Sequence, residues 1–205
     1  YSLPGMPCLY YGDELGMGDW PGLRDRDPNR TPMAWTPARN GGFSTAPDPL
    51  LVLPPITAPG YDYRVLNVEV QKQLPGSLLN WHRRMLICRR LLPALQSGTF
   101  RLLSCTHPGV IVYVRSTEAM TVLVAGNFTA AGAAVSLDLS DWQGQRTREG
   151  MWGCEFPLAN DDWYVYLQPY GFNWWLIGEV EVEGTESSAE VPQELSQAAP
   201  VSSRT

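Results

Sequence analysis

Charged side chains beside two tryptophans form the part of this sequence that is best suited to chemistry. Eight acidic and basic residues fall within eighteen positions: Asp13, Glu14, Asp19, Arg24, Asp25, Arg26, Asp27 and Arg30. Trp20 lies among them and Trp35 follows. Carboxylates serve as acids, bases and nucleophiles, and the planar arginine fork binds oxygen ligands. The cluster therefore fits a binding or catalytic site, although a salt-bridged surface loop explains the same spacing equally well.

Asp13 and Glu14 are adjacent in the sequence, and this excludes them as a catalytic pair. Neighbouring residues that leave a strand point to opposite faces. A retaining glycosidase instead holds two carboxyl groups about 5–5.5 Å apart across one bond. One of the two can line a site while the other pairs with Arg24, Arg26 or Arg30.

Arg30 is a stronger candidate for ligand binding than Asp13 or Glu14. It precedes Thr31-Pro32-Met33, whose proline stiffens the backbone and can aim a side chain. If Asp27, three residues earlier, holds the Arg30 guanidinium, the fork could hydrogen-bond sugar hydroxyls. The alternative is an ion pair that only locks the loop. Trp20 and Trp35 could stack on sugar faces, but core packing is the commoner role of such residues.

The elements that position this cluster resemble the end of an α/β domain. The apolar run Pro7–Tyr11 lies between breakers and predicts a buried strand of a parallel sheet. The charged cluster begins just past its end, where α/β barrels place their sites. Residues 12–75 form a long connection rich in proline and glycine, and Ser77–Leu92 predicts a helix that begins at an N-cap serine.

From residue 100 the pattern changes to short strands separated by turns, which is typical of an antiparallel sandwich. The predicted strands are Phe100–Leu103, Val110–Arg115, Met120–Asn127, Ala134–Leu139, Arg146–Glu149, Trp163–Leu167 and Phe172–Ile177. We therefore divide the chain into residues 1–97, 98–177 and 178–205. The last segment lacks aromatic residues and is expected to be a disordered acidic tail.

Charge and composition narrow the classes of function. The net charge of −6 comes mainly from the tail, and the remaining 14 basic and 15 acidic residues argue against a nucleic-acid surface. No apolar run has the roughly eighteen residues of a membrane helix. The cysteines and histidines lack metal-site and disulfide-framework spacing, so we expect free thiols, no metal, no cofactor and a cytoplasmic location; they are Cys8, Cys88, Cys105, Cys154, His82 and His107.

Several segments resemble the α-amylase superfamily, glycoside hydrolase family 13. The likeness begins in residues 2–17, which read Ser-Leu-Pro-Gly-Met-Pro-Cys-Leu-Tyr-Tyr-Gly-Asp-Glu-Leu-Gly-Met and are similar to the eighth barrel strand. Residues 25–35 resemble the family segment Asp-x-x-Arg-Thr-Pro-Met-Gln-Trp, with Ala34 replacing the usual glutamine. Residues 169–175 are most similar to a branch that converts maltose into trehalose, although Arg24 stands where that branch often has glycine.

The resemblance implies the last strand, long loop and last helix of a (β/α)8 TIM barrel in residues 1–97, followed by an antiparallel β-sandwich. It also implies a retaining mechanism, in which a carboxylate nucleophile forms a glucosyl-enzyme and a second carboxyl acts as acid and then base. In the family these groups and a third carboxylate come from strands four, five and seven. The chain starts with tyrosine, so we expect a fragment whose catalytic residues lie upstream of Tyr1.

By the same resemblance, Arg30 matches an arginine that contacts the non-reducing glucose of the substrate. Asp27 is the second candidate for substrate binding, and Asp13 and Glu14 rank below it. The implied partners are a small disaccharide, maltose or trehalose, and the missing N-terminal barrel portion of the same polypeptide. Two alternatives remain: a hydrolytic α-glucosidase or oligo-1,6-glucosidase of the same superfamily, and a non-catalytic sugar-binding β-sandwich.

Overall fold

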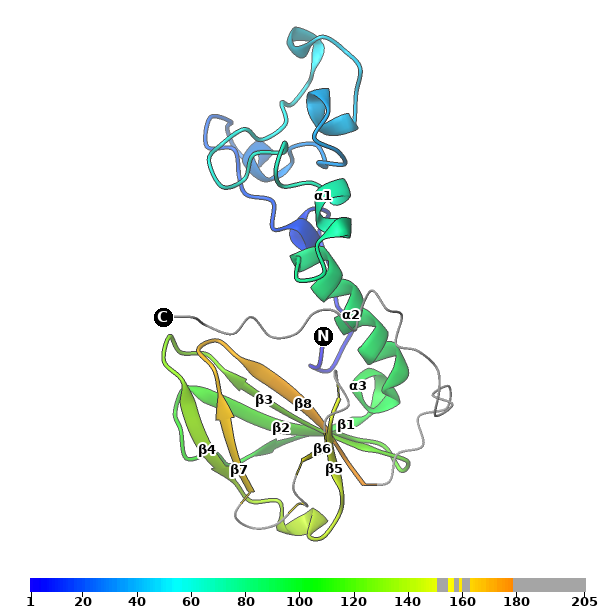
Figure 1. Ribbon diagram of the computed structural model, residues 1–205, viewed down its shortest axis with the longest axis vertical. Coiled ribbons are helices and arrows are strands. Elements are labelled where there is room, and N and C mark those ends of the chain that lie inside the picture. Colours follow the sequence, from blue (N-terminus) through cyan, green and yellow to red (C-terminus); the bar gives the residue numbers. More distant parts are fainter. Residues whose placement is uncertain (151–154, 157–158, 160–162, 179–205) are drawn as a thin grey trace. The chain divides into compact units, whose positions relative to one another are not determined.

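The structure, a computed structural model, describes residues 1–150, 155–156, 159 and 163–178 (Figure 1). Contacts divide the described residues into two compact units. One unit comprises residues 8–84, and the other comprises residues 1–7 and 85–178. The division therefore falls inside a helix, whereas the boundary that we expect near residue 97 stays a prediction.

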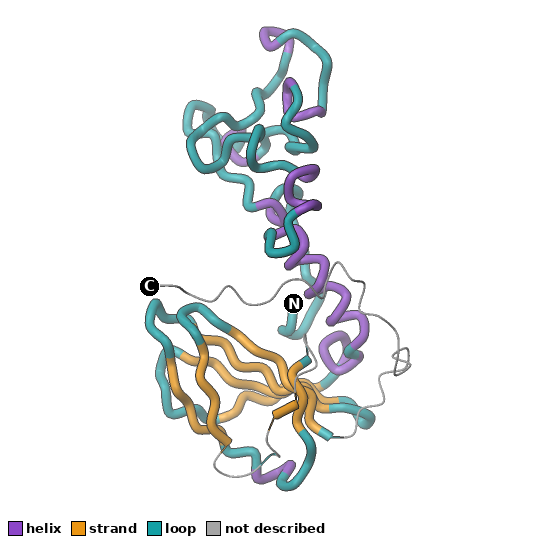
Figure 2. The backbone as a smooth tube through the Cα atoms, viewed as in Figure 1, coloured by secondary structure: helices purple, strands orange, loops and turns teal. Residues whose placement is uncertain are grey.

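Residues 8–84 are built mainly from loops and short helical turns, as Figure 2 shows. The regular elements are the 3-10 turns η1 (Asp13–Leu15), η2 (Asp27–Asn29), η3 (Arg39–Gly42) and η4 (Asp48–Leu50), the helix α1 (Val68–Gln73), and the first half of α2 (Leu78–Leu91). Four hydrophobic side chains of this unit are buried: Leu15, Ala34, Ile56 and Val68. The unit therefore depends on polar contacts as well as on apolar packing.

Two buried amide side chains, Asn67 and Gln71, hold this long connection in place. Asn67 caps α1 by accepting from the Val70 amide at 2.9 Å, and its Nδ2 donates to the Tyr63 carbonyl. The Nε2 of Gln71 donates to the carbonyl of Leu15 at 2.8 Å, 56 positions away in the sequence. Because buried amides are costly unless they are hydrogen-bonded, these contacts fix the loop in one conformation.

The predicted strand Pro7–Tyr11 is not formed. Residues 7–10 have no regular secondary structure, and Tyr11 begins a turn. Leu9, Tyr10 and Tyr11 are 41%, 49% and 44% exposed. A strand exists only through hydrogen bonds to a neighbouring strand, and no described residue pairs with this segment as a strand.

The predicted helix is confirmed as α2 (Leu78–Leu91). Ser77 acts as its N-cap, because its hydroxyl accepts from the Asn80 amide at 3.2 Å. A further short helix, α3 (Pro93–Ser97), follows directly. Its first residue is Pro93, and proline suits the first position of a helix.

The remaining residues form two antiparallel sheets. The strands are β1 (Thr99–Leu103), β2 (Val110–Ser116), β3 (Thr121–Asn127), β4 (Ala133–Leu137), β5 (Thr147–Glu149), β6 (Glu155–Phe156), β7 (Trp163–Leu167) and β8 (Phe172–Ile177). Among the described residues one sheet has the order β1-β2-β3-β8-β5-β6, and the other pairs β4 with β7. This confirms the seven predicted strands and adds β6.

The core of the β-sheet unit lies between the two sheets. Leu123 on β3, Val135 on β4 and Trp175 on β8 are each 0% exposed and belong to the same hydrophobic cluster. The rings of Trp163 and Trp175 meet edge to face at 4.9 Å between centroids. Side chains from both sheets thus interdigitate, as in a sandwich.

The described residues include no helix that is long and apolar enough to cross a membrane. They contain no cluster of three histidine, cysteine, aspartate or glutamate side chains suited to a metal ion. Residues 179–205, which make up nearly all of the predicted acidic tail, lie outside them.

Candidate functional site

Arg30 and Asp27 lie at the two ends of η2 and touch through the backbone. The Arg30 amide donates to the Asp27 carbonyl at 3.0 Å, and Arg30 ends the turn as its C-cap. The Arg30 side chain is exposed. Ion pairs within the described structure join other residues, namely Arg39 with Asp48, Arg64 with Asp62, and Arg101 with Asp141. The expected ion pair between the Asp27 carboxylate and the Arg30 guanidinium is therefore not formed.

Tyr11 is the residue that the structure adds to the neighbourhood of Arg30. Its hydroxyl donates to the carbonyl of Thr31, a buried residue, at 3.0 Å. Burial, followed by a hydrogen bond with Tyr10, raises the pKa of Tyr11, and the positive charge of Arg30 acts against this rise. The phenol and the guanidinium are thus close enough to interact, although neither residue type nor spacing predicted it.

Tyr10 and Tyr11 also form an exposed aromatic pair. Their ring centroids are 4.6 Å apart and the planes are tilted by 37°. Both rings are nearly half exposed. Aromatic faces next to an arginine fork are suited to a ligand that has both apolar faces and hydroxyl groups.

Asp13 and Glu14 hydrogen-bond to the backbone just before them. The Oδ2 of Asp13 accepts from the Tyr10 amide at 3.0 Å, and the Oε2 of Glu14 accepts from the Gly12 amide at 2.9 Å. Neither forms an ion pair with an arginine of the cluster among the described residues. The two carboxylates therefore fix the turn that follows Tyr11.

His82 on α2 lies within the field of these two carboxylates. Burial lowers the pKa of His82, and the negative charges of Glu14 and Asp13 act in the opposite direction. The ring also meets Trp81 edge-on, with 5.0 Å between centroids. The structure thus connects the turn after Tyr11 electrostatically to the first half of α2.

Backbone contacts position the two tryptophans of the charged region. The Trp20 amide donates to the Pro28 carbonyl at 2.9 Å, which closes the loop that carries Arg24 and Arg26. Trp35 donates to the Gly41 carbonyl at 2.8 Å and accepts from the Glu69 amide at 3.0 Å. Its ring remains 49% exposed. Trp35 is therefore both anchored and available to a ligand.

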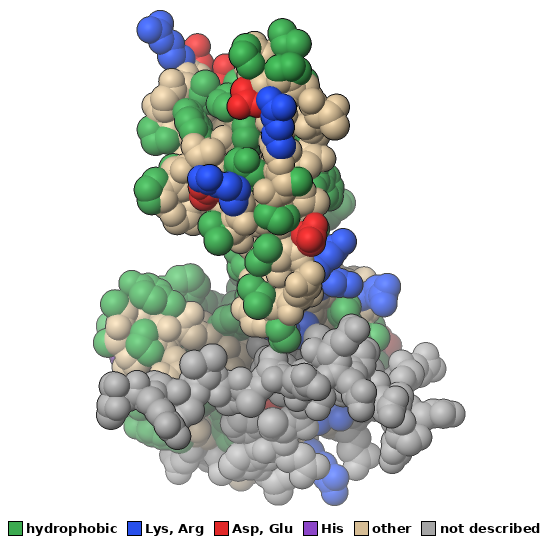
Figure 3. All heavy atoms as spheres, turned by 45° about the horizontal axis from the view of Figure 1, so that its top comes forward, with side chains coloured by type: hydrophobic (Ala, Val, Ile, Leu, Met, Phe, Trp, Pro, Cys, Tyr) green, Lys and Arg blue, Asp and Glu red, His purple; other side chains and the backbone are tan. Residues whose placement is uncertain are grey.

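Residues between 32 and 53 line two open hollows, neither of which includes Arg30. The larger hollow, of about 650 Å³, is lined by Ala38, Arg39, Gly42, Phe43, Ser44 and Thr45. The other, of about 470 Å³, shares Phe43 and Ser44 and includes Pro32. Figure 3 shows charged side chains scattered between hydrophobic ones over this unit. Arg30 and Tyr11 therefore lie outside the lining of both hollows.

Comparisons with known proteins match the chain almost throughout. Residues 1–98 match the family described as "Alpha amylase, catalytic domain", and residues 100–174 match "Maltogenic Amylase, C-terminal domain". A trehalose synthase/amylase from Mycobacterium tuberculosis is 44% identical over 185 residues, which cover 88% of this chain and 31% of the relative. A trehalose synthase from Pimelobacter is 42% identical over 188 residues, which cover 89% and 33%.

A solved structure shows the same fold. The trehalose-6-phosphate hydrolase of Bacillus licheniformis superimposes with a TM-score of 0.68 at 20% identity, over 87% of this chain and 37% of the hydrolase chain. The chain spans about a third of the length of the two curated relatives from Mycobacterium tuberculosis and Pimelobacter.

Proposed function

Because this chain belongs to the α-amylase superfamily, we propose that it is the C-terminal part of an enzyme that interconverts maltose and trehalose. The observation that carries the proposal is the identity of 44% and 42% to relatives named as trehalose synthases. These alignments span both the barrel segment and the β-sheet segment. The predicted disaccharide substrate follows from this proposal.

The proposed reaction is a retaining transfer of glucose within one disaccharide. A carboxylate attacks the anomeric carbon of the non-reducing glucose unit of maltose. A carboxylic acid protonates the oxygen of the departing glucose. The departing glucose then attacks the glucosyl-enzyme through its anomeric hydroxyl, and the carboxylate that gave the proton takes one back. Excluding water is what separates this outcome from hydrolysis. We assign the two carboxyl groups to a part of the polypeptide outside residues 1–205.

In this proposal, Arg30 hydrogen-bonds hydroxyls of the glucose unit that is transferred. Its exposed guanidinium and the absence of a described ion pair support this role, since an arginine that locks the loop through an ion pair needs a carboxylate partner. Tyr11 supplies a neighbouring aromatic face. Asp27 supports the turn through its carbonyl, and its carboxylate is free to reach the same sugar or the guanidinium once substrate is bound. Asp13 and Glu14 act indirectly, by holding the turn after Tyr11.

We also place the enzyme in the cytoplasm. Among the described cysteines, Cys8 and Cys105 are free thiols. Free thiols persist in a reducing compartment.

Product analysis tests the proposed function against its alternatives. The complete enzyme is incubated with maltose, and the products are separated by chromatography. Trehalose as the main product supports the isomerase, whereas glucose alone identifies the hydrolytic α-glucosidase. If neither product forms but the 205-residue chain binds maltose in a calorimetric titration, the sugar-binding module is correct.

A further inference from the structure

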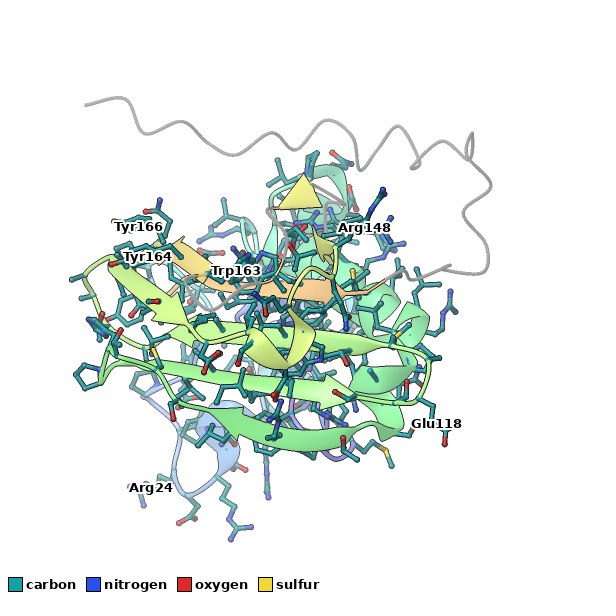
Figure 4. All side chains as sticks on the ribbon, turned by 90° about the horizontal axis from the view of Figure 1, so that it is seen from below. Arg24, Glu118, Arg148, Trp163, Tyr164 and Tyr166 are labelled. Carbon is teal, nitrogen blue, oxygen red and sulfur yellow. The ribbon has the colours of Figure 1, made fainter. Side chains whose placement is uncertain are left out.

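Two exposed tyrosines project from the same face of β7. Side chains along β7 alternate between buried and exposed, and the exposed positions are Tyr164 at 71% and Tyr166 at 59%. Figure 4 shows both at the rim of the domain, with Trp163 nearer its interior. Buried neighbours on β7 belong to the hydrophobic core, so the two phenol rings lie on the outer face of the smaller sheet.

The strand beside β7 makes this face flat. In the antiparallel register, Tyr166 lies opposite Ala134 and Tyr164 lies opposite Ser136 of β4. Both opposing side chains are small and leave the rings uncovered. Residues two apart on one face of a strand are separated by about 6.6–6.8 Å, which is on the scale of one sugar ring. The two phenols therefore form a short aromatic strip along β7.

The end of the Tyr166 ring lies against Gly132 in the turn before β4. A Cβ built on Gly132 would collide with the hydroxyl and the ring of Tyr166, so only glycine leaves room for the phenol to lie there. Asn127 holds the turn, because its Nδ2 donates to the carbonyls of Ala131 at 2.7 Å and Gln168 at 2.9 Å. The turn therefore leaves open the space in which the Tyr166 ring lies.

We propose that this β4–β7 face, made by Ala134, Ser136, Tyr164 and Tyr166, is a second sugar-binding surface. At this surface the two phenol rings stack on consecutive glucose rings of a neutral α-glucan. The inference rests on the proposed function, which supplies the substrate class. Because none of the four residues carries a charge, the face suits a neutral ligand with many hydroxyl groups. A phosphorylated or acidic ligand would find no cation among them.

The size of the β4–β7 face also favours a small ligand over a protein partner. Each strand has five residues. Two such strands cover about 17 Å by 10 Å, or on the order of 200 Å². A standard protein interface buries about 800 Å² on each partner. A chain of two or three glucose rings, in contrast, matches the length of this strip.

Affinity electrophoresis of the 205-residue chain tests the proposal. The native protein is run in gels with and without soluble amylose, and retardation gives the dissociation constant. We expect retardation of the native chain, and at least a tenfold weaker affinity when Tyr164→Ala and Tyr166→Ala are combined. Replacing both tyrosines by phenylalanine should retain most of the affinity, because the stacking faces remain. Tyr170→Ala, at a 70% exposed tyrosine outside both strands, is the matched control and should bind like the native chain.

Gly132→Ala provides a second, independent test of the proposal, because this variant keeps both tyrosines but displaces the Tyr166 ring. We expect it to weaken amylose binding while the thermal unfolding transition is kept. No retardation of the native chain, or equal retardation of all variants, would overturn the proposal. So would a concentration-dependent dimer, seen by sedimentation, that the double alanine variant abolishes. The maltose product assay reports on the proposed function separately, because it measures chemistry in the complete enzyme rather than amylose binding.

Discussion

Arg115 donates a hydrogen bond from Nη1 to the carbonyl oxygen of Ser2 at 2.9 Å, across 113 positions of sequence. The same guanidinium donates to the carbonyls of Leu95 at 3.1 Å, Gly98 at 2.9 Å and Thr99 at 3.2 Å. Its side chain is 1% exposed. A buried arginine on β2 thus joins the start of the chain and the end of α3 to the larger sheet through backbone oxygens alone.

Arg115→Ala should lower the free energy of unfolding by about 2–4 kcal/mol, because four carbonyls lose a charged donor and a cavity remains. Arg115→Lys should recover only part of this loss, since an ammonium group lacks the planar fork. Urea denaturation of the chain measures both changes. Arg101→Ala is the control, because Arg101 forms an exposed pair with Asp141 and should cost about 1 kcal/mol or less. Equal losses at the two arginines would contradict this role of Arg115.

The imidazole of His82 should titrate below its ordinary pKa of 6.5, because burial disfavours its charged form. A lowered folded-state pKa means that the unfolded chain binds more protons, so stability falls as the pH drops from about 6.5 through the folded pKa. Proton NMR can follow the titration directly, since His107 provides the other imidazole signal. Glu14→Gln should lower the pKa of His82 further, and an unchanged or raised value would show that the carboxylate does not act on the ring.

Arg30→Ala in the complete enzyme should lower kcat/KM roughly tenfold to a hundredfold, the cost of about 1.5–3 kcal/mol for one charge-assisted hydrogen bond. Arg30→Lys should recover little. Arg24→Ala is the matched control, because Arg24 lies on the same loop and projects outward in Figure 4. Unchanged kcat/KM with a lower Tm for Arg30→Ala would instead support the loop-locking role.

A polypeptide of residues 85–178 should unfold cooperatively on its own, because it contains the hydrophobic cluster between the two sheets. Residues 8–84 bury only four hydrophobic side chains and should show no cooperative transition alone. Adding residues 1–84 should raise the Tm of the β-sheet unit, since Arg115 and Arg89 then regain the carbonyls of residues 1–5. Circular dichroism during heating follows the unfolding of all three polypeptides. A sharp transition of residues 8–84 would show that their polar contacts suffice for folding.

The sequence predicted the β-sheet unit well, because core and exposed residues alternate along a strand wherever one of its faces is buried. Strand β7, with exposed Tyr164 and Tyr166 between core residues, is the clearest instance. The two-residue β6 is too short to show such a pattern. α1 was missed because its buried anchors are the amides of Asn67 and Gln71, which have no apolar periodicity.

The candidate site was predictable in part. Arg30 stands out from its motif, and its exposure agrees with a binding role. Its nearness to Tyr11 was not predictable, because it depends on how the loop folds back so that the phenol reaches the Thr31 carbonyl. Arg115 was missed for a similar reason: its partners are backbone carbonyls, which have no sequence signature. The strand expected at Pro7–Tyr11 failed because an apolar run does not specify a pairing partner.

A crossover experiment tests the central claim most directly. The complete enzyme is given an equal mixture of unlabelled maltose and maltose with both glucose units labelled with ¹³C, and the products are analysed by mass spectrometry. Transfer within one disaccharide predicts trehalose in which both units are labelled or neither is. Glucose without trehalose, or trehalose with one labelled unit as the commonest form, would contradict an intramolecular maltose–trehalose isomerase.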